Sequence, residues 1–249
     1  EIVHAEVIPA TLQRAFKMAM QPPTGPVLVS IPQNVLEQNI DFQYKPNTVV
    51  YSRLRPDKAA LDSAQKILQE AKRPVLLVES GVERSDALEE VVRFAELTGS
   101  RVYQSWMSDV NFPVTHPQYL GDLDPTSPPA KGVFREMDVL IGVGCSLFAQ
   151  GFFNPEPTLP PKARIIQIDE NPWEIGKNFP VDCGIQGDIK SVLAELNELI
   201  ERGTSPKGRE EVNGRAKEIA QEKSKQNHQL KIQIENERDR VPISISRLM

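Results

Sequence analysis

Short apolar runs alternate with amphipathic stretches through the middle of this 249-residue chain, and this alternation constrains the fold most strongly. Continuous apolar runs are typical of parallel strands that are buried on both faces. The sequence therefore predicts an α/β fold, a doubly wound parallel sheet of about six strands with helices on both faces. The strands that can be placed are residues 74–79, 101–105, 138–144, 164–169 and 183–186.

Three amphipathic helices are expected beside these strands. Asp57 can cap the first helix, and Gly99 can end the second. The apolar residues of each helix recur at spacings that place them on one face. The three sets are Leu61, Ala64, Leu68 and Ala71; Leu88, Val91, Val92 and Ala95; and Ile189, Val192, Leu193, Leu196, Leu199 and Ile200.

The flanking segments predict a chain that holds parts of more than one domain. Residues 1–45 offer one helix, at about 10–20, and one apolar strand, at 27–31, which cannot bury each other's apolar surface alone. We therefore expect the rest of that strand's sheet to lie outside this chain. The further segments are a proline-bounded linker at 46–56, the α/β domain at 57–203, a charged helical linker at 204–240 and the start of another apolar element at 241–249.

The composition argues against several classes of function. The net charge of −5 gives no basic footprint for nucleic acid. No apolar run approaches the roughly 18 to 20 residues that span a membrane, so no membrane partner is expected. Cys145 and Cys183 lie far apart and have no second Cys or His at metal-ligand spacing. We expect two reduced, buried thiols in a cytoplasmic protein.

Glycines and carboxylates follow the expected strands, at the edge of a parallel sheet where ligands bind. Gly81 follows the first strand, Gly142 and Gly144 end the strand at 138–144, and Asp169 and Asp188 follow the last two strands. Such glycines let a phosphate approach the backbone, and an acidic residue can accept hydrogen bonds from ribose hydroxyls. The alternative is that the glycines only allow tight turns and the aspartates only cap helices. The pair at 142 and 144 also lacks the third glycine of a dinucleotide fingerprint.

One histidine, His116, lies in the proline-rich loop NFPVTHPQYLG. The sequence shows no G-x-S-x-G turn and no carboxylate pair placed for acid–base catalysis. His116 is a candidate catalytic residue because it lies in a loop at a strand's exit, between Pro113 and Pro117. In the active site of a complete parent protein, its imidazole could transfer protons or hold a substrate carboxylate. The alternative is a purely structural residue of the loop.

Several segments resemble the thiamine-diphosphate-dependent enzymes of the acetolactate synthase and 2-oxo acid decarboxylase superfamily. TGPVLVSIPQNVL resembles the last strand of their pyrimidine-binding domain. RPVLLVESGV, ELTGSRVYQS, FPVTHPQYLGDL and MDVLIGVGCSLF resemble their central domain, which has an FAD/NAD-binding-like fold. The most specific match is IIQIDENPWEIGKNFPVDCGIQGDIKSVLAEL, and VPISISRLM resembles the start of their pyrophosphate-binding domain. Within the superfamily, the stretches FPVTHP and AMQPPTGPV resemble the benzoylformate decarboxylase type most.

The resemblance implies a parent enzyme that acts on a 2-oxo acid with thiamine diphosphate and Mg²⁺, as a homodimer or homotetramer. That parent would be a decarboxylase of the benzoylformate decarboxylase type or an acetolactate-synthase-type carboligase. In such enzymes a glutamate of the first domain and a G-D-G…N run of the last domain hold the cofactor, and neither lies in this sequence. We therefore expect no cofactor and no activity in this chain alone.

The resemblance also leaves two roles open for the central domain, because relatives hold FAD, ADP or nothing there. In a nucleotide-binding module, the three strand-end glycines would give backbone access, Asp169 would bind the ribose and Asp188 would lie near the adenine. Glu79 and Ser80 stand where nucleotide-binding relatives tend to have glycines, and Phe148, Phe152 and Phe153 would fill the space of a flavin. We therefore expect a scaffold domain without FAD, with ADP-like binding in a vestigial pocket as the alternative.

Overall fold

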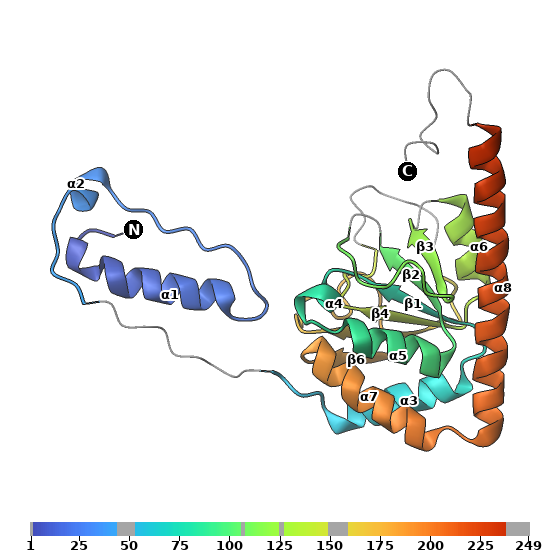
Figure 1. The fold of residues 1–249 in the computed structure, drawn as a ribbon. Coiled ribbons are helices and arrows are strands. Elements are labelled where there is room, and N and C mark those ends of the chain that lie inside the picture. The colour runs from blue at the N-terminus through green and yellow to red at the C-terminus, as the bar shows by residue number, and fades with distance from the viewer. Residues whose placement is uncertain (1, 44–52, 106–107, 125–126, 149–158, 238–249) are drawn as a thin grey trace. The chain divides into compact units, whose positions relative to one another are not determined.

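The chain forms two compact units, Glu1–Arg53 and Leu54–Met249, each with its own apolar core (Figure 1). The structure is a computed structural model, and it describes residues 2–43, 53–105, 108–124, 127–148 and 159–237. Among the described helices, none combines the length and the apolar character that crossing a membrane requires.

The second unit is built on a six-stranded sheet in the order β3-β2-β1-β4-β5-β6. Every neighbouring pair of strands is parallel, so the predicted fold class is confirmed. The strands are β1 Pro74–Val78, β2 Arg101–Ser105, β3 Tyr119–Leu123, β4 Val139–Val143, β5 Arg164–Asp169 and β6 Cys183–Gln186. β3 was not placed from the sequence, because Gly121 and Asp122 interrupt its apolar pattern.

Helices cover both faces of this sheet, but unequally. Side chains of alternate β1 residues enter two separate cores: Leu76 and Val78 face α3 Lys58–Glu70, α5 Leu88–Thr98 and α7 Ile189–Gly203, which lie together in Figure 1. Val75 and Leu77 face the opposite core, to which α6 Pro128–Glu136 contributes Phe134. α6 was not predicted, because it begins with two prolines and is only nine residues long.

The expected helix ends are confirmed by their capping contacts. The Asp57 side chain accepts a hydrogen bond from Ala59 N at 2.7 Å and caps α3. Gly99 follows α5 in the left-handed conformation, with φ of +60°. The predicted apolar stripe of α5 was wrong at its start, because Leu88 is 40% exposed while Phe94 is fully buried. Phe94 lies one turn before the end of the helix and points into the core beside β1.

A 31-residue helix, α8 Pro206–Asn236, follows α7. Ile219 is its one buried residue within the described part of the helix. Polar contacts attach α8 instead. Arg215 donates to Ala71 O at 3.2 Å and to Thr98 O at 2.8 Å, and Lys223 donates to His116 O at 2.8 Å.

The first unit contains η1 Ala5–Val7, α1 Ile8–Met20 and the short α2 Gln33–Leu36. The predicted helix at 10–20 is present and begins two residues earlier. The predicted strand at 27–31 is not formed, and Leu28 within it is 94% exposed. An extended segment becomes a strand only beside a hydrogen-bonded neighbour, and no described strand pairs with it. A backbone bond joins this segment to the beginning of the described chain, from Ile2 N to Ser30 O at 3.1 Å.

Candidate functional site

The sheet has a topological switch point between β1 and β4, where the order of the strands reverses. From β1 the strands continue outward to β2 and β3, and from β4 they continue in the opposite direction to β5 and β6. In open α/β sheets, ligands bind at such a switch point, outside the carboxyl ends of the strands. The residues that follow β1, β4, β5 and β6 at this edge therefore form the candidate site.

Two of the predicted glycines meet at the switch point. Gly81 N donates to Gly144 O at 3.2 Å, which joins the segments that follow β1 and β4. A Cβ at Gly81 would lie 2.5 Å from Gly144 Cα and 2.9 Å from the Ile189 side chain. Gly144 also has a φ of +59°, which L side chains rarely adopt. Both glycines thus serve a backbone-to-backbone contact.

The third glycine, Gly142, lies within β4, one residue before its end. A Cβ there would lie 2.6 Å from Leu147 Cδ2 and 2.7 Å from Cys145 Sγ. The missing side chain therefore makes room for the turn that follows β4. The structure places Gly142 in the packing beneath the edge and not at its surface.

Both predicted aspartates make local capping bonds. Asp169 Oδ1 accepts from Asn171 N at 2.8 Å, in the turn after β5. Asp188 Oδ1 accepts from Ser191 N at 2.9 Å and from Ser191 Oγ at 2.6 Å, at the start of α7. Each residue is only 7% exposed. The backbone brings them together, because Gly187 N donates to Asp169 O at 3.1 Å.

Asp169 also carries an unusual charge balance. Burial raises the pKa of its carboxyl from 3.8 to about 6, although the bond from Asn171 N opposes this shift. Glu174 and Glu170 raise the pKa further, while Arg84 lowers it. An acid in such surroundings is poised to titrate near neutral pH.

Sequence reasoning missed Gln167, a fully buried amide within β5. Its Nε2 donates to Cys145 O and to Glu174 O, both at 2.9 Å, and its Oε1 accepts from Gly176 N at 2.9 Å. These bonds fasten the loop after β5 to the turn after β4. The signal was the one polar residue in the apolar run IIQI, because a buried amide must find hydrogen-bond partners.

His116 lies at the opposite edge of the sheet from these residues. It stands three residues before β3, and Gln118 O accepts from Val102 N near the start of β2. His116 Nδ1 accepts from Gln118 N at 3.2 Å, and Nε2 lies 3.5 Å from Glu96 Oε1. The expected position at a strand's exit is therefore wrong: the imidazole lies at the amino ends of the strands, packed edge-on against Phe112.

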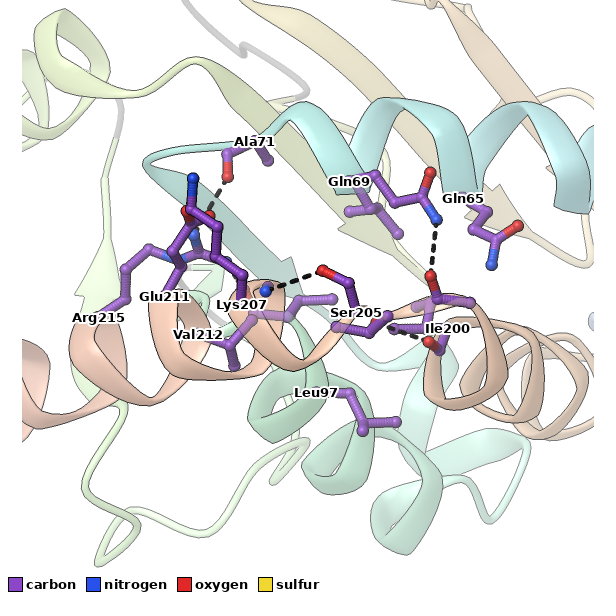
Figure 2. A pocket seen from close by; sticks show the side chains of 15 residues that line it. Gln65, Gln69, Ala71, Leu97, Ile200, Ser205, Lys207, Glu211, Val212 and Arg215 are labelled. Atoms are coloured by element: carbon purple, nitrogen blue, oxygen red, sulfur yellow. Dashed lines mark hydrogen bonds and ion pairs between the residues drawn. The ribbon is translucent and has the colours of Figure 1, made fainter.

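A cavity of about 350 Å³ lies where α3, α5 and α7 end and α8 begins (Figure 2). Its polar groups cap these helix ends. Gln69 Nε2 donates to Gly203 O at 3.3 Å, and Arg215 reaches Ala71 O, as Figure 2 shows. Arg215 was not singled out in the sequence, since one arginine in a charged helix gives no distinguishing pattern. None of the predicted site residues lines this cavity.

A family model described as "Thiamine pyrophosphate enzyme, central domain" matches residues 61–196. The chain belongs to this family of central domains. The matched segment begins within α3 and ends within α7, so it contains all six strands of the sheet.

Relatives of this central-domain protein include acetolactate synthases. The acetolactate synthase large subunit of Corynebacterium glutamicum is 38% identical over 196 residues, which are 77% of this chain and 31% of that protein. The probable acetolactate synthase large subunit of Methanocaldococcus jannaschii is 36% identical over 209 residues, which are 79% of this chain and 34% of that protein. The chain thus spans about a third of the length of these relatives.

Solved structures show the same fold. A putative thiamin diphosphate-dependent enzyme from Mycobacterium smegmatis aligns with a TM-score of 0.69 and 31% identity, over 80% of this chain and 38% of its own. Benzoylformate decarboxylase from Polynucleobacter necessarius aligns with a TM-score of 0.69 and 24% identity, over 80% of this chain and 37% of its own. The second likeness is one of fold alone.

Gly81→Ala tests the glycine contact at the switch point. The added methyl group would meet the Gly144 backbone, which cannot move aside as a flexible side chain would, so we expect a loss of about 1–3 kcal/mol in the free energy of unfolding. Gly132→Ala is the matched control, because nothing lies within 4 Å of a Cβ there and alanine favours the α6 helix. Urea unfolding of both variants and of the wild type measures their free energies of unfolding. A Gly81→Ala variant as stable as Gly132→Ala would contradict the glycine contact.

Asp169→Asn tests the buried carboxyl. Because the folded pKa is raised to about 6, the stability that Asp169 contributes is fully present below its unfolded pKa and is lost as the pH rises through about 6. Asparagine keeps the capping oxygen and carries no charge. Relative to wild type, we expect the variant to gain up to about 3 kcal/mol of stability between about pH 4 and pH 7. Urea unfolding of both proteins at about pH 4 and about pH 7 measures this gain. A stability difference that is the same at both pH values would refute the raised pKa of Asp169.

Proposed function

We propose that this chain is the central part of a larger thiamine-diphosphate-dependent enzyme that acts on a 2-oxo acid. The observation that carries this proposal is the family match across the whole sheet, together with relatives about three times as long. In this proposal the domain supports the catalytic parts of the enzyme and does not itself perform chemistry. The internally bonded switch-point edge supports such a structural role.

Thiamine diphosphate, when bound, would supply the carbanion-stabilising chemistry of the reaction. Within the described residues, no group of three or more His, Cys, Asp or Glu side chains is arranged to hold a metal ion. We therefore assign Mg²⁺ and the diphosphate to other parts of the parent enzyme. The parent is proposed to be a cytoplasmic homodimer or homotetramer, and the buried, unpaired Cys145 and Cys183 are compatible with a reducing compartment.

Two reactions are candidates for the parent. Carboligation of the acetolactate synthase type is favoured by 36–38% identity to proteins of that name. Decarboxylation of the benzoylformate decarboxylase type is favoured by the segments FPVTHP and AMQPPTGPV. Both reactions begin with a 2-oxo acid, and they differ in whether a second carbonyl compound is joined to the product.

The strand-end residues Gly81, Gly142, Gly144, Asp169 and Asp188 are proposed as a vestigial nucleotide pocket. Gly81 and Gly144 are used for a backbone contact, Gly142 makes room for side chains of the turn after β4, and the aspartates are used for capping. These residues therefore do not fit FAD or ADP well. Phe148, one of the residues expected to fill a flavin's space, is buried against Phe134. Phe152 and Phe153 lie outside the described residues.

The parent enzyme and this chain give different expected results in one assay. With thiamine diphosphate and Mg²⁺, the complete parent should release CO₂ from pyruvate or benzoylformate. Acetolactate as the product from pyruvate would identify carboligation, and benzaldehyde from benzoylformate would identify simple decarboxylation. This chain alone should show no turnover and no saturable cofactor binding below about 1 mM, or roughly −4 kcal/mol, by calorimetry. Tight binding by the chain alone would contradict the assignment of the cofactor to other parts.

His116→Ala in the complete parent tests the histidine as a catalytic residue. If the imidazole transfers protons or holds the substrate carboxylate, kcat/KM should fall at least about tenfold, or about 1.4 kcal/mol. His116→Asn is the informative partner, because its amide oxygen can still accept from Gln118 N and preserve the loop. Equal losses of kcat/KM in both variants would support a catalytic role for the imidazole. His228→Ala, which removes an exposed histidine, is the control and should leave kcat/KM unchanged. Retention of kcat/KM in His116→Asn would reduce His116 to a structural residue.

A further inference from the structure

The turn that follows β4 is bonded by side chains from several other segments. Gln167 Nε2 donates to Cys145 O, and Asn178 Nδ2 donates to Ser146 O at 2.5 Å and to Leu147 O at 3.3 Å. The carbonyl groups of this turn are thus satisfied by amides. The donors of Ser146, within the same turn, are satisfied in a different way, by carboxylates.

Ser146 presents two donors, and an acidic side chain takes each of them. Glu79 Oε2 accepts from Ser146 N at 3.2 Å. Burial raises the pKa of Glu174, but hydrogen bonds from Lys177 and from the Ser146 hydroxyl lower it below its usual range. Two carboxylates therefore meet at Ser146. Among the described residues, an ion pair with a lysine is made by Glu174, to Lys177, and not by Glu79.

Glu79 is held in this position by its own backbone. It is the residue directly after β1, and its N–H donates to Val143 O at 3.2 Å, so it continues the pairing of β1 with β4. Two residues later, Gly81 N donates to Gly144 O. The side chain of Glu79 thus starts from a fixed point at the switch between the two halves of the sheet, and it reaches directly to the turn after β4.

A free backbone N–H at the switch-point edge is a group that could donate to a bound phosphate. Here a carboxylate already accepts from that N–H, and its charge would repel a second anion at close range. The helix that follows β1 does not offset this, because α4 Gly81–Arg84 has only four residues and a correspondingly small dipole. Further carboxylates, Asp169 and Glu170, face the same edge, with Arg84 near both.

We propose that Glu79 is a built-in anion that occupies the phosphate position of the switch point and determines that this domain rejects nucleoside diphosphates. The capping and packing contacts around it shape the edge, while Glu79 supplies the charge that excludes phosphate. This inference concerns the present chain alone and is independent of the function proposed for the parent.

The test is a binding titration of the full chain with ADP, inorganic pyrophosphate and adenosine. Glu79→Gln keeps the size of the side chain and removes its charge, so affinity for ADP and pyrophosphate should rise at least about tenfold over wild type, or about 1.4 kcal/mol. Affinity for adenosine, which carries no phosphate, should stay unchanged. Glu83→Gln is the matched control, because it removes an exposed carboxylate from α4, four residues away, and should leave all three affinities at the wild-type value.

Three results would overturn the proposal. The first is wild-type chain that binds ADP as tightly as the Glu79→Gln variant. The second is a gain in Glu79→Gln no larger than that in Glu83→Gln, and the third is an equal gain for adenosine. Thermal unfolding is recorded for each variant, and Glu79→Ala provides a second route if the glutamine side chain destabilises the turn. A failure here would leave the thiamine-diphosphate assay of the parent unaffected, because that assay does not depend on nucleotide binding.

Discussion

The pairing of β1 with β4 is the interaction on which the rest of the large unit depends. All five residues of each strand are buried, so the pair is surrounded by core on both faces. Before the strands begin, Asp138 accepts from Lys72 N at 2.6 Å and from Arg73 N at 2.9 Å. After they end, Gly81 lies directly on Gly144. The register of the central pair is thus held at both ends, and the outer strands extend from it.

This arrangement bears on what the domain is suited to do. A binding site needs donors and acceptors that are free to meet a ligand, whereas the described contacts at the switch point use them within the protein. Gln167 and Asp169 fasten the loop after β5, and Glu79 fastens the turn after β4. A body stiffened in this way suits the support of other domains, in keeping with the role proposed for it.

Much of the fold could be predicted from the sequence, because its strands are continuous apolar runs and its helices have regular stripes. β3 escaped prediction since tertiary pairing, and not its own pattern of Gly121 and Asp122, makes it a strand. The candidate site was only partly predictable. Topology places Gly81, Gly144, Asp169 and Asp188 at one edge, as the order of the strands implied. Whether the two aspartates serve a ligand or the protein depends on their partners, Asn171 N for Asp169 and Ser191 for Asp188, which the sequence pattern does not reveal. His116 was misplaced because the loop that carries it runs to the other edge of the sheet.

The attachment of α8 has a mechanical consequence. Of the described contacts between this helix and the body of the unit, the one furthest along it is made by Lys223, which donates to two loop carbonyl groups and lies over the Tyr119 ring. From Lys223 the helix continues for about 20 Å to Asn236. If α8 tilted by about 5° about Lys223, its C-terminal end would move by about 2 Å, given that length of helix. A small change at the cationic contacts of Arg215 and Lys223 would therefore be magnified at the far end of α8.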